Sequence, residues 1–184
     1  MSDRYFTQLE SPVGLLTLTA TSEGLTGLHF DRDRRSQRAA DFTRSDAPFA
    51  GVILQLREYF ERRRTSFQLE LAPEGTPFQR RVWAALRDIP FGHTLSYGEL
   101  ARGIGVPAAS RAVGAANGQN PIGIIVPCHR VIGKSGALTG FAGGIPRKQF
   151  LLEHESRHPA LFGQKSLPMA LREFRPVPAR TSLC

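Results

Sequence analysis

The sequence has little cysteine and no apolar run long enough to cross a membrane. Only Cys128 and Cys184 occur among its 184 residues, too few to make a disulfide framework or a four-ligand zinc site by themselves. No run approaches the roughly 20 apolar residues that span a bilayer, and the first residues lack a signal-peptide pattern. With 41% apolar and 22% charged residues, the composition is typical of a globular protein. We expect an intracellular, cytoplasmic protein with no membrane attachment.

Acidic residues are scarce in the middle of the chain. Residues 1–76 hold 10 basic and 11 acidic side chains, whereas residues 77–150 hold 9 basic and only 2 acidic ones. Nearly all of the net charge of +8 therefore lies in this central segment. One-sided charge of this kind favours a polyanion partner, nucleic acid first and an anionic membrane second. A basic face that is merely solvated is the alternative.

The N-terminal residues predict a small sheet covered by a helix. Period-two alternation recurs between residues 5 and 30, with turn signals between the alternating stretches. Apolar residues from Val52 to Phe60 repeat at helical spacing and predict a helix that lies on the sheet. Residues 67–71 alternate again and predict a further strand. We expect residues 31–47 to form a loop or the frayed start of a helix.

A break in both periodicities marks a domain boundary. Residues 73–77, Pro-Glu-Gly-Thr-Pro, suit neither a helix nor a strand and coincide with the change in charge. They predict a linker between an N-terminal α/β domain, residues 1–72, and a second domain, residues 78–157.

The second domain has a helical character. A first helix should begin at Phe78 and end before Pro90, and Ser96 with Glu99 forms a capping-box signal for a short second helix. A third helix follows Pro107 after a glycine-containing turn. Two short helices joined in this way predict a helix-turn-helix. The third helix should bury Ala112, Val113 and Ala116.

The rest of the chain divides into three stretches. Residues 121–146 are rich in Gly and Pro, which predicts loops and turns. A last helix is predicted over residues 147–154, with Phe150 and Leu151 facing inward. Residues 158–184 show no sustained period and predict an irregular or disordered tail, in which Cys184 is simply a terminal thiol.

The chemistry of the chain centres on Cys128, which lies between an apolar run and a His-Arg pair in Pro-Cys-His-Arg-Val. A lone cysteine is commonly a small buried hydrophobe, so packing is one interpretation. Cationic neighbours would instead lower its pKa from about 8.5 and make the sulfur a nucleophilic thiolate. His129 could then take the thiol proton if an acid orients its ring. Glu153 and Glu155 are both candidates for that acid.

The helix over residues 108–116 carries one long side chain, Arg111, among Ala, Ser and Gly. Helices that read the major groove usually carry several long polar side chains. Small residues allow close backbone approach, which suits the minor groove and little base-specific readout, and Arg111 could then enter the base stack. An Ala-rich core helix is the alternative.

The cysteine motif, together with Arg111-Ala-Val-Gly114 and Asn120-Pro121, resembles the signature of the O6-alkylguanine-DNA alkyltransferases. The resemblance covers roughly residues 3–157 and includes Ser11-Pro-Val-Gly14 and the stretch from Thr94 to Leu100. It implies an α+β fold: a small N-terminal antiparallel sheet with a helix, of RNase H-like type, then a mostly helical domain with a winged helix-turn-helix.

The family resemblance also implies an activity. Its members flip O6-alkylguanine, and we expect also O4-alkylthymine, out of duplex DNA and move the alkyl group irreversibly to a cysteine. The implied partner is double-stranded DNA, contacted at the minor groove by a monomer, with cooperative binding left open. No cofactor and no metal are implied, because the alkyl group arrives on the DNA.

Site residues follow from the same resemblance. Cys128 matches the acceptor, activated by His129 through a water, and Glu155 rather than Glu153 matches the acid that orients His129. Asn120 matches the residue that joins the recognition helix to the cysteine loop. Tyr97 matches an aromatic residue near the phosphate and the base edge, placed to donate a proton to the leaving guanine. The implied DNA contacts are Arg111, as the finger that fills the gap left by the flipped base, with Tyr97, Ala109, Ser110, Gly114 and Arg130. The implied pocket walls are Val126, Pro127, Leu138, Phe141, Ala142 and Gly143.

Three positions depart from patterns seen in relatives. Phe141 stands where some relatives have Tyr, Ala142 where they have Ser, and Gly123 where they have a second proline. These departures predict a different pocket, either roomier or less polar, with some tolerance of bulky alkyl groups. No cysteine lies in residues 1–76, so the zinc site of some relatives is not expected, and His29 is interpreted as a surface or strand-end histidine.

Other functions remain to be separated from this one. A non-catalytic damage-binding relative would replace the acceptor cysteine, which is present here. A helix-turn-helix transcription factor would need a dimer interface and polar base-reading side chains. A cysteine hydrolase built on Cys128, His129 and Glu155 would turn over many times, whereas an alkyl acceptor stops after one transfer.

Overall fold

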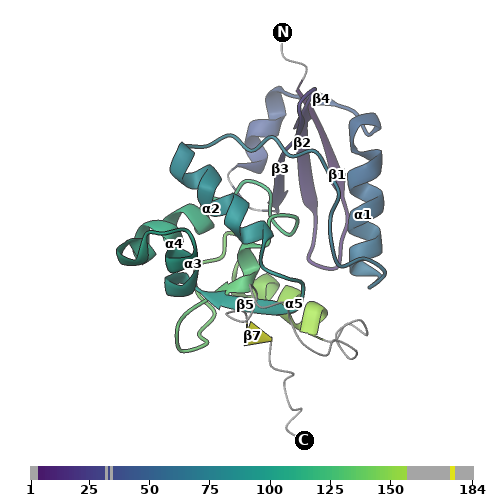
Figure 1. The fold of residues 1–184 in the computed structure, drawn as a ribbon. Coiled ribbons are helices and arrows are strands. Elements are labelled where there is room, and N and C mark those ends of the chain that lie inside the picture. The colour runs from purple at the N-terminus through teal and green to yellow at the C-terminus, as the bar shows by residue number, and fades with distance from the viewer. Residues whose placement is uncertain (1–3, 32, 34, 157–174, 177–184) are drawn as a thin grey trace, which may run out of the picture.

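Three strands form an antiparallel meander at the start of the chain (Figure 1). The computed structural model describes residues 4–31, 33, 35–156 and 175–176. Strand β2 (Leu16–Thr21) lies between β1 (Tyr5–Leu9) and β3 (Gly24–Phe30). It carries apolar residues on one face and threonines on the other, and both faces are buried. The two-residue strand β4 (Thr43–Arg44) pairs in parallel with β1, so the sheet is antiparallel except at this edge.

Helix α1 (Ala50–Phe60) runs alongside the sheet, as its apolar spacing predicts (Figure 1). Val52, Leu56 and Tyr59 form its buried stripe. Along the chain, the segment from β3 to α1 contains two short 3-10 helices, one before and one after β4 (Ser36–Asp41 and Ala47–Phe49). The sequence predicts a loop or the frayed start of a helix here.

The prediction of a strand over residues 67–71 is wrong. The segment makes one parallel bridge, Leu25 with Leu71, at the β3 edge of the sheet. Two backbone hydrogen bonds hold it there, from Leu25 N to Glu70 O (2.9 Å) and from Ala72 N to Leu25 O (2.8 Å). Pro73 follows at once and lacks an N–H, so the ladder does not continue.

The helical elements of the second half begin with two capping boxes. Helix α2 (Pro77–Arg87) is capped by Thr76 with Gln79, and α3 (Tyr97–Gly103) is capped by Ser96 with Glu99 as predicted. Each box satisfies backbone N–H groups that the first helical turn leaves unpaired. Strand β5 (His93–Ser96) ends at this second cap and leads directly into α3.

Helix α3 and helix α4 (Ser110–Gly118) are joined by a glycine turn and a 3-10 helix (Pro107–Ala109), which gives the predicted helix-turn-helix. Figure 1 shows the pair on the side of the molecule away from α1. Helix α4 buries Val113, Ala116 and Asn117. Ala112, predicted to face inward, is exposed because it lies one residue from this stripe.

The remaining elements begin with the turn that holds Cys128. A 3-10 turn (Cys128–Arg130) leads into β6 (Val131–Ile132), which pairs in parallel with β5. Helix α5 (Ile145–Ser156) buries Leu151 as predicted, but Phe150 is 38% exposed and stacks on the His154 ring instead. Strand β7 (Arg175–Pro176) pairs antiparallel with β5. The prediction of an irregular tail is wrong for these two residues, and Cys184 lies outside the described residues.

The N-terminal sheet also holds the segment that leads to Cys128. Leu28 N donates to Pro121 O (2.9 Å), and Gly123 N donates to Leu28 O (3.1 Å). A Cβ on Gly123 would lie 3.0 Å from the Phe30 ring, so this glycine serves close packing against the sheet. One apolar core cluster accordingly runs through both halves of the chain, from Val13 to Leu151. No helix among the described residues has the length and apolar character needed to cross a membrane.

Candidate active site

Cys128 sits at the first position of a buried turn and is 5% exposed. Its backbone N–H donates to the Val126 carbonyl (2.8 Å), and the Asn120 side chain donates to the same carbonyl (2.8 Å). Asn120 Oδ1 in turn accepts from Ile122 N (3.0 Å). Asn120 thus connects the end of α4 to the cysteine turn, the place that the sequence analysis gives it.

Backbone strain is stored in the same loop. Ile124 has a φ of 67°, in the left-handed region that a β-branched residue rarely adopts. Such a conformation costs about 1–3 kcal/mol and persists only where the surroundings enforce it. Ile124 is 1% exposed, and the Val126 N to Ile122 O hydrogen bond (3.0 Å) closes the backbone around it. The loop before Cys128 is therefore held in one conformation by its packing.

His129 and Glu155 are brought together in the interior, as predicted. His129 Nε2 lies 2.8 Å from Glu155 Oε1, and neither side chain is exposed. His129 Nδ1 makes no hydrogen bond within the described part of the chain. With Nε2 committed to the carboxylate, Nδ1 is the ring nitrogen left for exchange of a proton.

Glu155 is the centre of a wider network. Its carboxylate accepts from Tyr59 Oη (2.9 Å), Gly92 N (3.0 Å) and the Arg130 guanidinium (2.8 and 2.9 Å). Burial alone would raise the pKa of Glu155, but Arg130 and His129 hold it well below its ordinary range. Glu155 is therefore an ionised, fixed acceptor for His129. Glu153, the other candidate acid, is engaged by Gln149 (2.9 Å).

The assignment of Arg130 to the DNA surface needs correction. Arg130 is 7% exposed, pairs with Glu155 through two nitrogens, and donates to the Ile89 carbonyl (2.6 Å). A buried guanidinium that is paired with a carboxylate is not available to bind a DNA phosphate. Arg130 is a structural partner of the His129–Glu155 pair.

Burial sets the protonation of Cys128 and His129. It raises the pKa of the Cys128 thiol, against the opposing effects of the Asn120 hydrogen bond and of Lys148 and Arg35. The prediction that the Cys128 pKa lies below its ordinary value is therefore wrong, because burial outweighs the lowering effects of Asn120, Lys148 and Arg35. Burial also lowers the pKa of His129, although Glu155 opposes the shift. The resting site holds a neutral thiol beside a neutral imidazole, which can accept the thiol proton.

Tyr97 begins α3 and faces the loop that follows β6. Its hydroxyl donates to the Thr139 carbonyl (3.2 Å). Burial raises the pKa of Tyr97, so the phenol keeps its proton and can donate it in a hydrogen bond. A Cβ on Gly114 would meet the Tyr97 ring at 3.6 Å, which places α4 in direct contact with this side chain.

Four of the residues assigned to DNA lie in α4 or directly before it. Arg111 and Ala112 are exposed in the first helical turn, and Ala109, Ser110 and Gly114 are half-buried. Arg111 therefore projects from a surface of small side chains, the arrangement that the sequence indicated.

The predicted pocket residues differ in burial. Val126 and Pro127 are buried beside Cys128, Leu138 is half-buried, and Ala142 is exposed. Phe141 packs edge-on against Phe30 of β3, with ring centroids 5.4 Å apart. A Cβ on Gly143 would lie 2.7 Å from the Phe141 ring, so this glycine makes room for the aromatic pair.

Three buried residues beside the site were missed. Tyr59 reaches Glu155 from α1, and Asn117 lies 3.4 Å from the Cys128 carbonyl. Lys148 donates from α5 to Val131 O (2.5 Å) and Thr139 O (2.7 Å). Burial lowers the Lys148 pKa to about 8, opposed by Cys128. Helical spacing from Val113 and Ala116 could have marked Asn117, but no local signal marks Tyr59 or Lys148.

Comparison with known proteins decides the family. Two family models match: 6-O-methylguanine DNA methyltransferase, ribonuclease-like domain, over residues 4–73, and 6-O-methylguanine DNA methyltransferase, DNA binding domain, over residues 77–157. The chain belongs to the 6-O-methylguanine DNA methyltransferase family. Cys128 lies within the residues that match the DNA binding domain of this family.

Relatives of this methyltransferase family match most of the chain. A methylated-DNA–protein-cysteine methyltransferase of Mycolicibacterium paratuberculosis is 52% identical over 82% of this chain and 91% of its own length. The corresponding Methanosarcina acetivorans protein is 48% identical over 82% of this chain and 97% of its own length. The crystal structure of Mycobacterium tuberculosis OGT in complex with DNA superposes with a TM-score of 0.78 at 50% identity, covering 85% of this chain and 96% of that one.

Within the described part of the chain, no group of three or more His, Cys, Asp or Glu side chains is arranged to hold a metal ion.

Proposed function

We propose that this protein repairs DNA by moving the alkyl group of O6-alkylguanine to Cys128, once per molecule. One observation carries the proposal: a buried cysteine adjoins a histidine that is hydrogen-bonded to an ionised glutamate, in a chain of the methyltransferase family. We extend the same activity to O4-alkylthymine, whose alkyl carbon is attached in the same way.

The transfer step follows from the protonation states of the site. The Cys128 thiol gives its proton, through a water, to His129 Nδ1, and the resulting imidazolium faces the Glu155 carboxylate at 2.8 Å. The sulfur attacks the alkyl carbon as the bond between that carbon and O6 breaks. The electron pair left on guanine is stabilised by a hydrogen bond from the Tyr97 hydroxyl. The guanine anion then takes up a proton, which the proton held on His129 balances by way of water, and the products are a thioether on Cys128 and an unmodified guanine.

Access to the buried thiol requires that the base leave the duplex. Extruding a base costs a few kcal/mol and is easier when its pairing is damaged. The exposed Arg111, set among small residues on α4, is suited to fill the gap from the minor groove. Excess positive charge in residues 77–150 supports attraction to phosphates. We propose that one molecule acts as a monomer on each damaged base.

Counting methyl groups tests this function. The protein is mixed with a tenfold excess of duplex that carries one O6-methylguanine, and restored guanine is measured over time. We expect a burst that ends at one guanine per protein molecule. Continued turnover would indicate a hydrolase, and tight binding without restored guanine would indicate a non-catalytic damage binder.

A further inference from the structure

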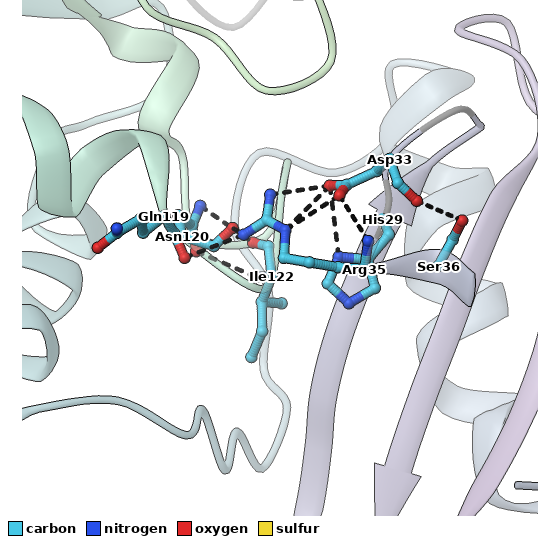
Figure 2. A network of polar contacts seen from close by, with 7 residues as sticks. All are labelled: His29, Asp33, Arg35, Ser36, Gln119, Asn120 and Ile122. Atoms are coloured by element: carbon cyan, nitrogen blue, oxygen red, sulfur yellow. Dashed lines mark hydrogen bonds and ion pairs between the residues drawn. The ribbon is translucent and has the colours of Figure 1, made fainter. Parts of the chain in front are cut away.

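A polar network joins the N-terminal domain to the end of α4 (Figure 2). The Arg35 guanidinium lies at its centre. Its Nη1 donates to the backbone carbonyls of Gln119 (3.0 Å) and Asn120 (2.9 Å). Its Nε and Nη2 donate to the Asp33 carboxylate at 2.8–3.1 Å. Arg35 therefore binds two carbonyls that lie 84 and 85 residues further along the chain.

Asp33 fixes the direction of this guanidinium. Its side chain is 9% exposed and also accepts from the backbone N–H of Arg35 (2.9 Å), while its own carbonyl accepts from Ser36 Oγ (2.6 Å). Burial would raise the pKa of Asp33, but His29 and Arg35 hold it well below its ordinary range. His29, interpreted from sequence as a surface or strand-end residue, is 7% exposed at the end of β3, with Nδ1 3.7 Å from Asp33.

The carbonyls that Arg35 binds have a particular position. Gln119 is the C-cap of α4, where unpaired carbonyls concentrate partial negative charge, so a cation there stabilises the helix end. Asn120 is the residue whose side chain ties down Val126 O and Ile122 N ahead of Cys128. Arg35 therefore holds the backbone of the residue that holds the cysteine turn.

We propose that Arg35 is a positioning residue for alkyl transfer: from the N-terminal domain it fixes Gln119 and Asn120, and through Asn120 it fixes the turn that carries Cys128. This inference rests on the proposed transfer function. The positive charge of Arg35 also acts to lower the Cys128 pKa against the effect of burial. Lysine cannot replace it, because a single ammonium cannot bind two carbonyls and a carboxylate in the plane of a guanidinium.

The test compares Arg35→Met, which keeps the apolar stem, with Arg35→Lys and with Arg63→Met. Arg63 is a matched control because its side chain is 61% exposed and pairs with Glu61, away from this network. Four quantities are measured: melting temperature, DNA dissociation constant, transfer rate at saturating DNA, and the pH profile of Cys128 alkylation by iodoacetamide without DNA.

We expect Arg35→Met and Arg35→Lys to slow transfer at saturating DNA about tenfold, the size of a lost charge-assisted contact. DNA affinity should change less than twofold, and the iodoacetamide profile should move to higher pH. Arg63→Met should match the wild type. Millimolar methylguanidine should partly restore Arg35→Met, because a cavity of about 510 Å³ borders Arg35, Gln119 and Pro121 and admits such a molecule.

An unchanged transfer rate at saturating DNA together with an unchanged iodoacetamide profile would overturn the role of Arg35. A loss explained entirely by the unfolded fraction at the assay temperature would do the same. If Arg35→Met fails to fold, Asp33→Asn keeps the guanidinium but loosens its orientation, and should show the same pattern with a smaller loss. Absence of transfer in the wild type would instead reject the proposed function, while the iodoacetamide profile still tests Arg35.

Discussion

Glu155 is fully buried and accepts hydrogen bonds from His129, Arg130, Tyr59 and Gly92. A buried carboxylate is tolerated only when its charge is paired and its oxygens are satisfied. Arg130 pairs the charge of Glu155, and the other three donors satisfy its oxygens. The contact with Glu155 also orients the His129 ring to accept a proton from Cys128. Stability and chemistry are therefore linked at this position.

Replacing Glu155 by Gln separates charge from shape. The change leaves the Arg130 cation buried opposite a neutral amide, so we expect a loss of about 3–5 kcal/mol in the free energy of unfolding and a large drop in transfer rate. Tyr59→Phe removes one hydrogen bond to the same carboxylate and should cost only about 1 kcal/mol. Chemical denaturation of both variants checks this. Equal losses would mean that the ion pair contributes no more than the phenol.

The pH dependence of stability follows from the same two groups. His129 and Glu155 have folded pKa values below their ordinary 6.5 and 4.5, so the unfolded chain binds each proton more readily. The free energy of unfolding should fall as pH drops below about 6.5, through His129, and again below about 4.5, through Glu155. Denaturation at pH 7.5 and 5.5 tests the first window. His129→Gln should flatten it, whereas a wild-type stability that rises on acidification would contradict the assignment.

Helix α4 combines two roles at the scale of an element. Its inner stripe buries Val113, Ala116 and Asn117, and its outer face presents Arg111 among small residues. The sequence left an Ala-rich core helix and a DNA-binding helix as alternatives. Because α4 buries one face and exposes Arg111 on the other, its packing in the core does not exclude the proposed contact with DNA.

Arg111→Ala tests the outer face. The substitution touches no buried group, so the melting temperature should stay within about 1 °C. Repair of O6-methylguanine in duplex DNA should slow at least tenfold, because nothing then fills the gap left by the extruded base. Repair of the same lesion in a short single strand, where no gap forms, should change little. Equal effects on the two substrates would count against this role.

What the sequence could predict at this scale depended on local signals. The Ser96 capping box and the stripe of α1 need only neighbours a few residues apart, and both are found in the structure. The strand at residues 67–71 failed because pairing depends on a distant partner. The prediction that Arg130 contacts DNA failed for a related reason. The charge of Arg130 is visible in the sequence, but its buried partner Glu155 is 25 residues away. Tyr59 belongs to the predicted stripe of α1, but no local signal connects Tyr59 or Lys148 to the site.

At the scale of the whole molecule, the two halves of the chain contribute different residues to the site. The near-neutral residues 1–76 supply Tyr59 and the Leu28 backbone that hold the site. The basic residues 77–150 carry Cys128, the proposed nucleophile, and the surface proposed to contact DNA. Because one core cluster runs through both halves, a change at Cys128 should be felt beyond its own domain.

Methylation of Cys128 should therefore destabilise the protein. Cys128 is 5% exposed, and an added methyl in a packed interior costs about 1–3 kcal/mol. For a chain of this size each kcal/mol lowers the melting temperature by about 2–4 °C. Calorimetry before and after reaction with methylated duplex measures the shift, and Cys128→Ala treated identically is the control. A melting temperature unchanged by methylation would contradict the prediction.

The central claim is that Cys128 is the acceptor, and mass spectrometry of the reacted protein tests it most directly. After reaction with duplex carrying deuterated O6-methylguanine, the protein is digested and the two cysteine peptides are compared. Cys184 serves as an internal control within the same chain. We predict one deuterated methyl group on the Cys128 peptide and none on the Cys184 peptide. Label on Cys184, or restored guanine with no label on either cysteine, would contradict the account.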